Sequence, residues 1–190
     1  MKLHGSAAPP TEAHWLPQLV ALPADGLAVD IGCGYGRSVA WLKDRFTRVI
    51  GVDISPFIIG RARDAFQGMT NVEFYVSEAD SLPLDVPDRQ VAFLYAFTVF
   101  QHIPREYTRA YVQQARRKLR PGGVFVFNLL SDMNEDLNTG TAGSEWAIGY
   151  SSAAATALVQ QAGLNLQRLV RWRAAGAPAS WLWVSATCPP

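Results

Sequence analysis

A short apolar run in the stretch LAVDIGCGYGR is followed by three alternating glycines: Gly32, Gly34 and Gly36. Glycines lack a Cβ atom, so the chain can turn tightly and lie against a ligand. Asp30 stands two residues before the first glycine, which makes the pattern D-x-G-x-G-x-G. In the dinucleotide pattern G-x-G-x-x-G, the third glycine would fall on Arg37 or Val39. The loop therefore favours a ligand site that does not hold a dinucleotide, with a plain tight turn as the alternative.

Two further aspartates follow the next two predicted strands. Asp53 ends the run VIGVDIS, where an acid can accept hydrogen bonds from both hydroxyls of a ribose. Asp80 lies in VSEADSLPL, where an acid can accept a hydrogen bond from the exocyclic amine of a purine. Either aspartate by itself could be a solvated side chain or a helix cap. Together with Asp30, they place three acids at the ends of three successive strands, which favours an adenosine site.

The elements that must position these residues follow from the hydrophobic pattern. Apolar runs predict five buried strands at 27–31, 48–54, 72–79, 91–97 and 124–130. Helical patterns alternate with them at 37–46, 56–67, 104–119 and 152–163. Strands that are apolar throughout and alternate with helices predict a doubly wound, mostly parallel α/β sheet.

Turn chemistry completes the predicted fold. Ser55 and Pro56 supply an N-cap and a first-turn proline for the second helix. The segment RPGG, residues 120–123, has proline and glycine at the central positions of a type II turn. The last two runs, 164–172 and 180–188, are joined by too short a loop for a parallel crossover, so they should form an antiparallel hairpin.

The length, charge and composition of the chain limit its possible domain organisation and function. The 190 residues suggest one domain at 25–190, preceded by an arm and a short helix at 1–24. A formal net charge of +1 disfavours a nucleic-acid partner, because there is no basic excess to neutralise phosphates. Cys33 and Cys188 form neither a disulfide framework nor a C-x-x-C pair. No apolar run is long enough for a bilayer and no signal peptide is visible, so we expect a cytoplasmic protein without a membrane partner.

Five motifs occur in a characteristic order between residues 25 and 130: VDIGCGYGR, VIGVDIS, EADSLPL, VFQHIP and LRPGGVFVF. Together they resemble the successive motifs of class I S-adenosylmethionine-dependent methyltransferases. The resemblance implies a Rossmann-like sheet of seven strands whose last strand runs antiparallel. It also implies S-adenosyl-L-methionine as the cofactor.

Positions in these motifs imply individual cofactor contacts. The methionine part would be wrapped by the first motif, at Asp30, Gly32, Cys33, Gly34 and Gly36. Asp53 would hold the ribose, and Ile54 would pack against the adenine ring. Asp80 would bind the adenine amine, with the backbone of Ser81 nearby. Phe97 ends the fourth strand, where the transferred methyl group should point.

A general base would help if the methyl acceptor is an alcohol, because alcohols are poor nucleophiles. His102 in VFQHIP is the candidate catalytic residue, since an imidazole can take a proton near neutral pH. The alternative is that His102 only packs or caps at a helix start. Asp132 and Glu135 are interpreted as ordinary loop charges, and DMNED at 132–136 as solvated acids, so no metal is expected.

The methyl acceptor follows only from analogy. The stretch YAFTVFQHIPREY resembles small methyltransferases of natural-product and glycan biosynthesis, which implies a small-molecule hydroxyl on a sugar or secondary metabolite. One alternative is a nicotinamide-dependent dehydrogenase, which Arg37 argues against. The other is a non-catalytic, S-adenosylmethionine-binding regulatory module. The sequence does not indicate the oligomeric state.

Overall fold

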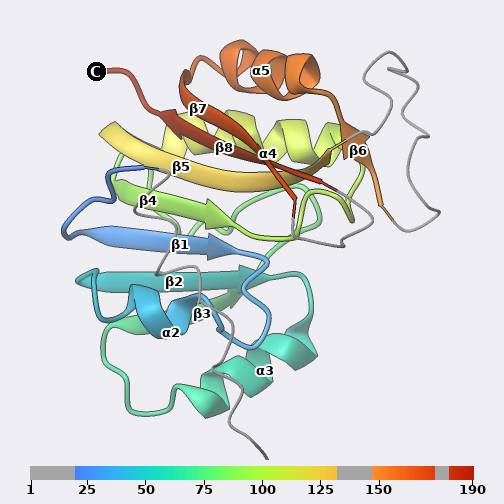
Figure 1. The fold of residues 1–190 in the computed structure, drawn as a ribbon. Helices are drawn as coiled ribbons and strands as arrows, with labels where there is room; N and C mark the ends of the chain where they lie inside the picture. The colour runs from blue at the N-terminus through green and yellow to red at the C-terminus, as the bar shows by residue number, and fades with distance from the viewer. Residues whose placement is uncertain (1–19, 132–146, 174–179) are drawn as a thin grey trace, which may run out of the picture.

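A computed structural model describes residues 20–131, 147–173 and 180–190 (Figure 1). Most of the predicted N-terminal arm, with its short helix, falls on residues 1–19 and lies outside the described residues. The same holds for the interpretation of Asp132 and Glu135 as loop charges and of 132–136 as solvated acids.

The described strands form one mixed sheet. Their order across the sheet is β3-β2-β1-β4-β5-β8-β7, with β6 paired to β5 beside this path. Their bounds are β1 Leu27–Ile31, β2 Arg48–Asp53, β3 Val72–Val76, β4 Val91–Ala96, β5 Leu119–Ser131, β6 Gly149–Tyr150, β7 Asn165–Trp172 and β8 Trp181–Thr187. The strands β1 to β5 pair in parallel, whereas β8 runs antiparallel to both β5 and β7. The predicted doubly wound sheet and its terminal hairpin are confirmed, and the two-residue β6 is an addition to them.

The segment RPGG is part of β5 in the structure, and it still turns. Val91 pairs with Leu119 and Phe93 pairs with Val124, so the register shifts across this segment. Gly122 adopts a φ of 71°, the left-handed conformation that the second central residue of a type II turn requires.

Four helices flank the sheet within the described residues: α2 Val39–Leu42, α3 Pro56–Ala65, α4 Arg105–Lys118 and α5 Ser152–Gln161. The prediction of a helix over 37–46 was wrong in length, because regular α-helix covers only four of those residues. Hydrogen bonds of the i→i−3 type, from Trp41 N to Ser38 O and from Arg45 N to Leu42 O, tighten its two ends into turns. The helix α3 begins as predicted, with the Ser55 hydroxyl accepting a hydrogen bond from Ile58 N at 3.3 Å.

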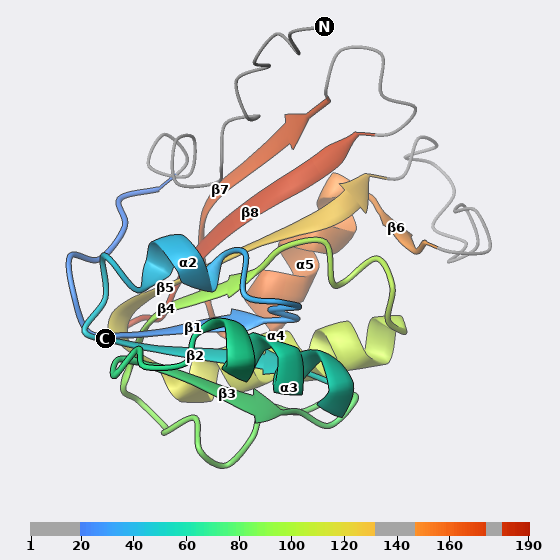
Figure 2. The ribbon, with the colours of Figure 1, turned by 90° about the horizontal axis from the view of Figure 1, so that it is seen from below.

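Helices cover both faces of the sheet. Figure 2 shows α2 and α3 in front of the strands, and α4 and α5 behind them. Two separate apolar clusters match this arrangement: α2 and α3 pack with Val49 and Phe93, and α4 and α5 pack with Leu94 and Phe125. Every residue of β1 and of β4 is buried, as a strand covered on both faces requires. None of the helices in the described part of the chain is long and apolar enough to cross a membrane.

Candidate functional site

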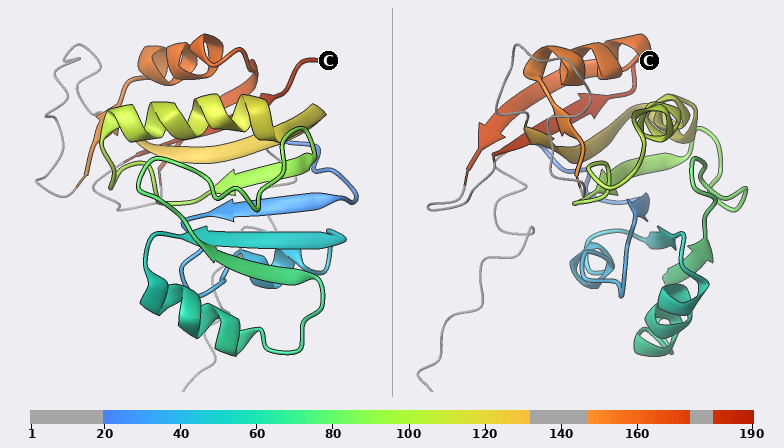
Figure 3. Two further views of the ribbon diagram at one scale, coloured as in Figure 1. Left: turned by 180° about the vertical axis from the view of Figure 1, so that it is seen from behind. Right: turned by 90° about the vertical axis from the view of Figure 1, so that its right-hand side faces the viewer.

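A cavity of about 230 Å³ lies at the carboxyl ends of β1 to β4. The right-hand view of Figure 3 faces this edge of the sheet. In open, mostly parallel sheets, ligands bind at this edge. The lining residues come from the four strand ends, the loop before α4 and the middle of α4: Ile31, Gly32, Asp53, Ile54, Ser77, Glu78, Ala79, Thr98, Val99, His102, Ile103 and Tyr111.

The glycine loop after β1 has the backbone conformation that its residue types predicted. Gly32, Gly34 and Gly36 all have positive φ, at 65°, 54° and 89°. A Cβ atom on Gly32 would collide with Val99, and one on Gly36 would collide with the ring of Phe66. A Cβ atom on Gly34 would meet no atom within 4 Å. Gly34 is therefore the place where the loop backbone is open to a ligand.

Asp53 joins the glycine loop to the start of α3. Its Oδ2 accepts a hydrogen bond from Gly34 N at 3.1 Å, and its Oδ1 accepts one from Ser55 N at 3.0 Å. The side chain lines the cavity and is half-buried. A carboxylate offers about four lone-pair positions, so both oxygens retain acceptor capacity toward a ligand.

Asp30 and Cys33 lie below the cavity surface. Asp30 is in β1 and is buried, and Cys33 is buried beside the glycine loop. Cys33 N donates to Val52 O at 2.9 Å, which ties the loop to β2. Burial raises the pKa of the Cys33 thiol, and the charges of Asp30 and Asp53 raise it further. The thiol is therefore neutral and serves packing, and neither side chain is among those that line the cavity.

The acid that the structure places at the third strand end is Glu78. We expected the third strand to extend through residue 79, which made Asp80 its terminal acid. The strand β3 instead ends at Val76, paired with Asp53, so Glu78 and Ala79 line the cavity. Asp80 is exposed, and neither it nor Ser81 is among the lining residues. The polar residue Ser77 is a signal that the strand ends before it. With that strand end, the acid that follows the strand is Glu78.

His102 lines the cavity and is exposed. Its main-chain N–H donates to Val99 O at 2.9 Å, which fixes the loop between β4 and α4. Its ring Nε2 lies 3.0 Å from Nε2 of Gln101, and because an amide nitrogen only donates, the ring nitrogen accepts this hydrogen bond. The imidazole thus stands at the cavity mouth, held at one nitrogen by a buried amide.

Phe97 does not reach the cavity. Its ring stacks on Tyr95 and on Trp183, with centroids 6.4 and 5.4 Å apart, on the face that α2 and α3 cover. The guanidinium of Arg37 lies 4.6 Å from the centroid of the Phe97 ring. Phe97 is therefore not among the lining residues, whereas the next residue, Thr98, lines the cavity.

Thr98 has an unusual backbone conformation. Its φ is 58°, and a β-branched residue in this region is a genuine outlier. Asn128 on β5 holds it there, since Oδ1 of Asn128 accepts from Thr98 N at 2.7 Å. The Thr98 hydroxyl donates to Phe97 O at 2.6 Å. Strained residues of this kind gather at functional sites, which supports a role for the carboxyl end of β4.

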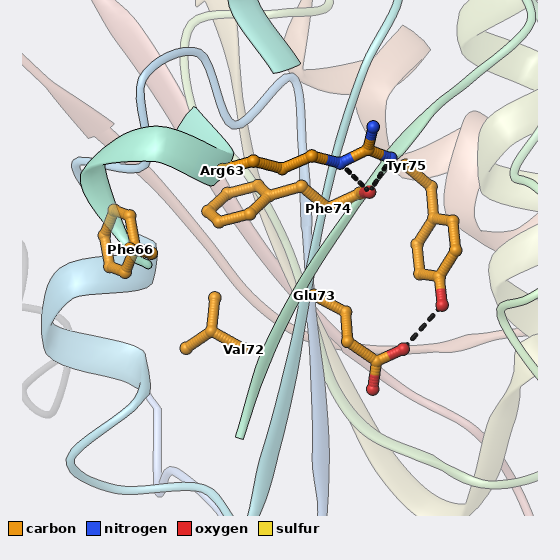
Figure 4. A pocket seen from close by; sticks show the side chains of 6 residues that line it. All are labelled: Arg63, Phe66, Val72, Glu73, Phe74 and Tyr75. Atoms are coloured by element: carbon orange, nitrogen blue, oxygen red, sulfur yellow. Dashed lines mark hydrogen bonds between the residues drawn. The ribbon is translucent and has the colours of Figure 1, made fainter. Parts of the chain in front are cut away.

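A second hollow, of about 310 Å³, lies beside the edge strand β3 and is less suited to a ligand. Figure 4 shows that its polar groups bind one another. Arg63 donates twice to Phe74 O, at 3.1 and 2.6 Å. The Glu73 carboxylate accepts from Arg48 and from the Tyr75 hydroxyl. These contacts cover an exposed sheet edge, where unprotected strands would pair with other chains.

No group of three or more His, Cys, Asp or Glu side chains in the described ranges could hold a metal ion. The acids at 132–136 lie outside those ranges.

Comparison with known proteins identifies the class to which this fold and site belong. Residues 28–123, half of the chain, match the family model described as "Methyltransferase domain". A solved S-adenosylmethionine-dependent methyltransferase from Mesorhizobium loti superposes with a TM-score of 0.76 at 18% identity, covering 93% of this chain and 97% of that one. The chain therefore belongs to the class I S-adenosylmethionine-dependent methyltransferase family.

Two curated relatives carry more specific names. A trans-aconitate 2-methyltransferase from Azoarcus sp. is 36% identical over 121 residues, which is 62% of this chain and 45% of the relative. A 2-heptyl-1-hydroxyquinolin-4(1H)-one methyltransferase from Mycobacteroides abscessus is 30% identical over 103 residues, 53% of this chain and 44% of the relative. This chain spans less than half the length of either relative.

Proposed function

We propose that this protein transfers a methyl group from S-adenosyl-L-methionine to an oxygen atom of a small molecule. The observation that carries the proposal is the cavity at the strand ends, which Gly32, Asp53, Ile54 and Glu78 line together. Its polar groups match an adenosine ligand, and Asp53 in its lining also binds the main-chain N–H of Gly34, where the loop is open for the methionine part.

Three features of the lining residues fit the cofactor. Asp53 retains acceptor capacity for ribose hydroxyls, although it already binds Gly34 and Ser55. Ile54 is 60% exposed, and an apolar side chain open to the cavity can pack against a flat purine. We assign the hydrogen bond from the adenine amine to Glu78 instead of Asp80, because Glu78 lines the cavity and Asp80 does not.

S-adenosyl-L-methionine supplies an activated methyl group, so the protein has to bind and orient the reactants. Holding two reactants in line removes much of the entropy cost of their encounter. Thr98 and His102 both line the cavity, and His102 can accept the proton that an acceptor hydroxyl releases. As placed, Nε2 of the imidazole accepts from the Gln101 amide, so this hydrogen bond has to open before Nε2 can take the proton.

A small hydroxylated acceptor is the finer part of the proposal. The names of the relatives refer to small molecules, trans-aconitate and a hydroxyquinolinone. Trans-aconitate offers carboxylate oxygens and the hydroxyquinolinone offers a hydroxyl, so oxygen is the nucleophile that we expect. The net charge of +1 does not favour nucleic acid as the acceptor. A dehydrogenase is disfavoured, because the glycine loop lacks the dinucleotide spacing and the chain belongs to another family.

Two measurements test this function. Isothermal titration with S-adenosylmethionine, S-adenosylhomocysteine and NAD should show binding of the first two only. Incubation with methyl-labelled S-adenosylmethionine should then label one compound in a panel of hydroxylated sugars, hydroxyquinolinones and trans-aconitate. NAD binding without S-adenosylmethionine binding would overturn the proposal. Cofactor binding with no labelled product from small molecules, but label on added protein or RNA, would overturn the assigned acceptor class.

A further inference from the structure

The segment between β3 and the buried residue Leu82 forms one wall of the cavity. It contributes Ser77, Glu78 and Ala79 to the lining, and it begins with a hydrogen bond from Ser77 N to Asp53 O at 3.0 Å. The segment has no regular secondary structure, so other elements must hold its backbone in place. The helix α4 does this through two side chains that lie more than thirty positions away in the chain.

Gln114 binds this segment at two points. Its Nε2 donates to Asp80 O at 2.7 Å, and its Oε1 accepts from Leu82 N at 2.9 Å. Both functional atoms of one side-chain amide are therefore engaged with the main chain. Since an amide has one acceptor oxygen and one donor nitrogen, no smaller or charged side chain reproduces both bonds.

Tyr111 binds the same segment one helical turn earlier. Its hydroxyl donates to Glu78 O at 3.0 Å. Residues three apart on a helix face the same side, so Tyr111 and Gln114 act on one stretch of backbone. Burial raises the pKa of the Tyr111 phenol, which keeps this group protonated as a donor. Val112 and Ala115, each fully buried and next to one of these residues in the chain, anchor α4 to the sheet.

We propose that Gln114, assisted by Tyr111, is a positioning residue that holds the Glu78 carboxylate in a fixed place. The site thereby selects a purine with an amino group at C6. The inference rests on the proposed function. A carboxylate held at a fixed position accepts a hydrogen bond from an amino group at C6 but meets a carbonyl there with repulsion. Without the hydrogen bonds from Gln114, the segment can shift and the carboxylate can move away from that carbonyl. The site then discriminates less strongly between a purine with an amino group at C6 and one with a carbonyl there.

The test compares S-adenosylhomocysteine with S-inosylhomocysteine, which has a carbonyl in place of the amino group at C6 and a proton on N1. Their Kd values are measured by isothermal titration for the full-length protein and for Gln114→Met, Gln114→Glu and Tyr111→Phe. The matched control is Gln113→Met, since Gln113 is exposed on the same helix. We expect the ratio of the two Kd values to fall roughly tenfold in Gln114→Met, because two hydrogen bonds that position the loop are lost. Gln114→Glu replaces the donor with an oxygen that repels the Asp80 carbonyl, so the ratio should fall at least as far as in Gln114→Met.

A purely structural role for Gln114 predicts a different result. The ratio of the two Kd values would then stay at its wild-type value while Tm falls, and that result overturns the inference. Tyr111→Phe removes a single hydroxyl, so it reports on the same ratio if Gln114→Met does not fold. A wild-type protein that binds neither ligand would refute the proposed function itself. A wild type that binds both ligands equally would leave the cofactor site standing and refute only this inference.

Discussion

The main-chain N–H of Gly34 donates a hydrogen bond to the Asp53 carboxylate at 3.1 Å, across the ends of β1 and β2. The same carboxylate also accepts from Ser55 N, at the N-cap of α3. One side chain thus sets the positions of the glycine loop and of the next helix. A ligand bound by Asp53 is therefore also aligned with the open backbone at Gly34.

Replacing Asp53 with alanine should weaken S-adenosylmethionine binding by about 1.5–3 kcal/mol, the usual range for hydrogen bonds to a charged group. Asp53→Asn, which keeps one acceptor oxygen, should lose less. Titration calorimetry measures both, with Asp64→Ala as the control because Asp64 is exposed on α3. An unchanged Kd in folded Asp53→Ala would remove Asp53 from the cofactor site.

If the His102 imidazole takes the proton of the methyl acceptor's hydroxyl, His102→Ala should reduce turnover about 10²–10⁴-fold. Its affinity for the cofactor should be nearly unchanged. Wild-type activity should also fall in acid, because a protonated imidazole cannot accept another proton. Initial rates at saturating cofactor and acceptor measure the effect across pH, with Glu106→Ala on the nearby exposed surface as the control. If His102 only packs, the variant keeps normal turnover and loses thermal stability, and orientation alone accounts for the reaction.

Asn128→Ala should destabilise the protein by about 1–3 kcal/mol, since it leaves the Thr98 N–H without its acceptor in a half-buried position. Turnover should fall as well, because Thr98 then leaves its left-handed conformation beside the cavity. Urea unfolding and initial rates check the two effects. Asn165→Ala, at an exposed position of β7, is the control. Full activity in a destabilised Asn128→Ala would show that the strained turn serves stability alone.

The Cys33 thiol should resist alkylation in the native state. Folding raises its pKa above the ordinary value of 9.0, so less thiolate is present at pH 8 than in the unfolded chain. For the same reason, folding stability should decline as the pH rises above 9, where the unfolded chain loses this proton first. Iodoacetamide labelling followed by peptide mass spectrometry reports Cys33 and the buried Cys188 separately. Rapid labelling of Cys33 in native protein would contradict the assigned environment.

Much of the parallel sheet could be predicted from the sequence, because its signals are local. The run at 91–97 is apolar at every position and the run at 27–31 is apolar except for Asp30, which indicates strands covered on both faces. Ser55 and Pro56 mark the start of α3 in the residues themselves. Asp53 was placed correctly at a strand end because β2 stops almost where its apolar run stops. The glycine loop was recognisable because positive φ demands a specific residue type.

Features that depend on strand register or on contacts between distant residues were decided only by the tertiary structure. The end of β3 at Val76 follows from its pairing with β2, and this brings Glu78 instead of Asp80 to the cavity. Phe97 turned to the opposite face because side chains alternate along a strand. The contacts of Gln114 with the backbone at Asp80 and Leu82 join positions more than thirty residues apart. Local propensity does not encode such contacts, because they exist only once α4 has packed against the sheet.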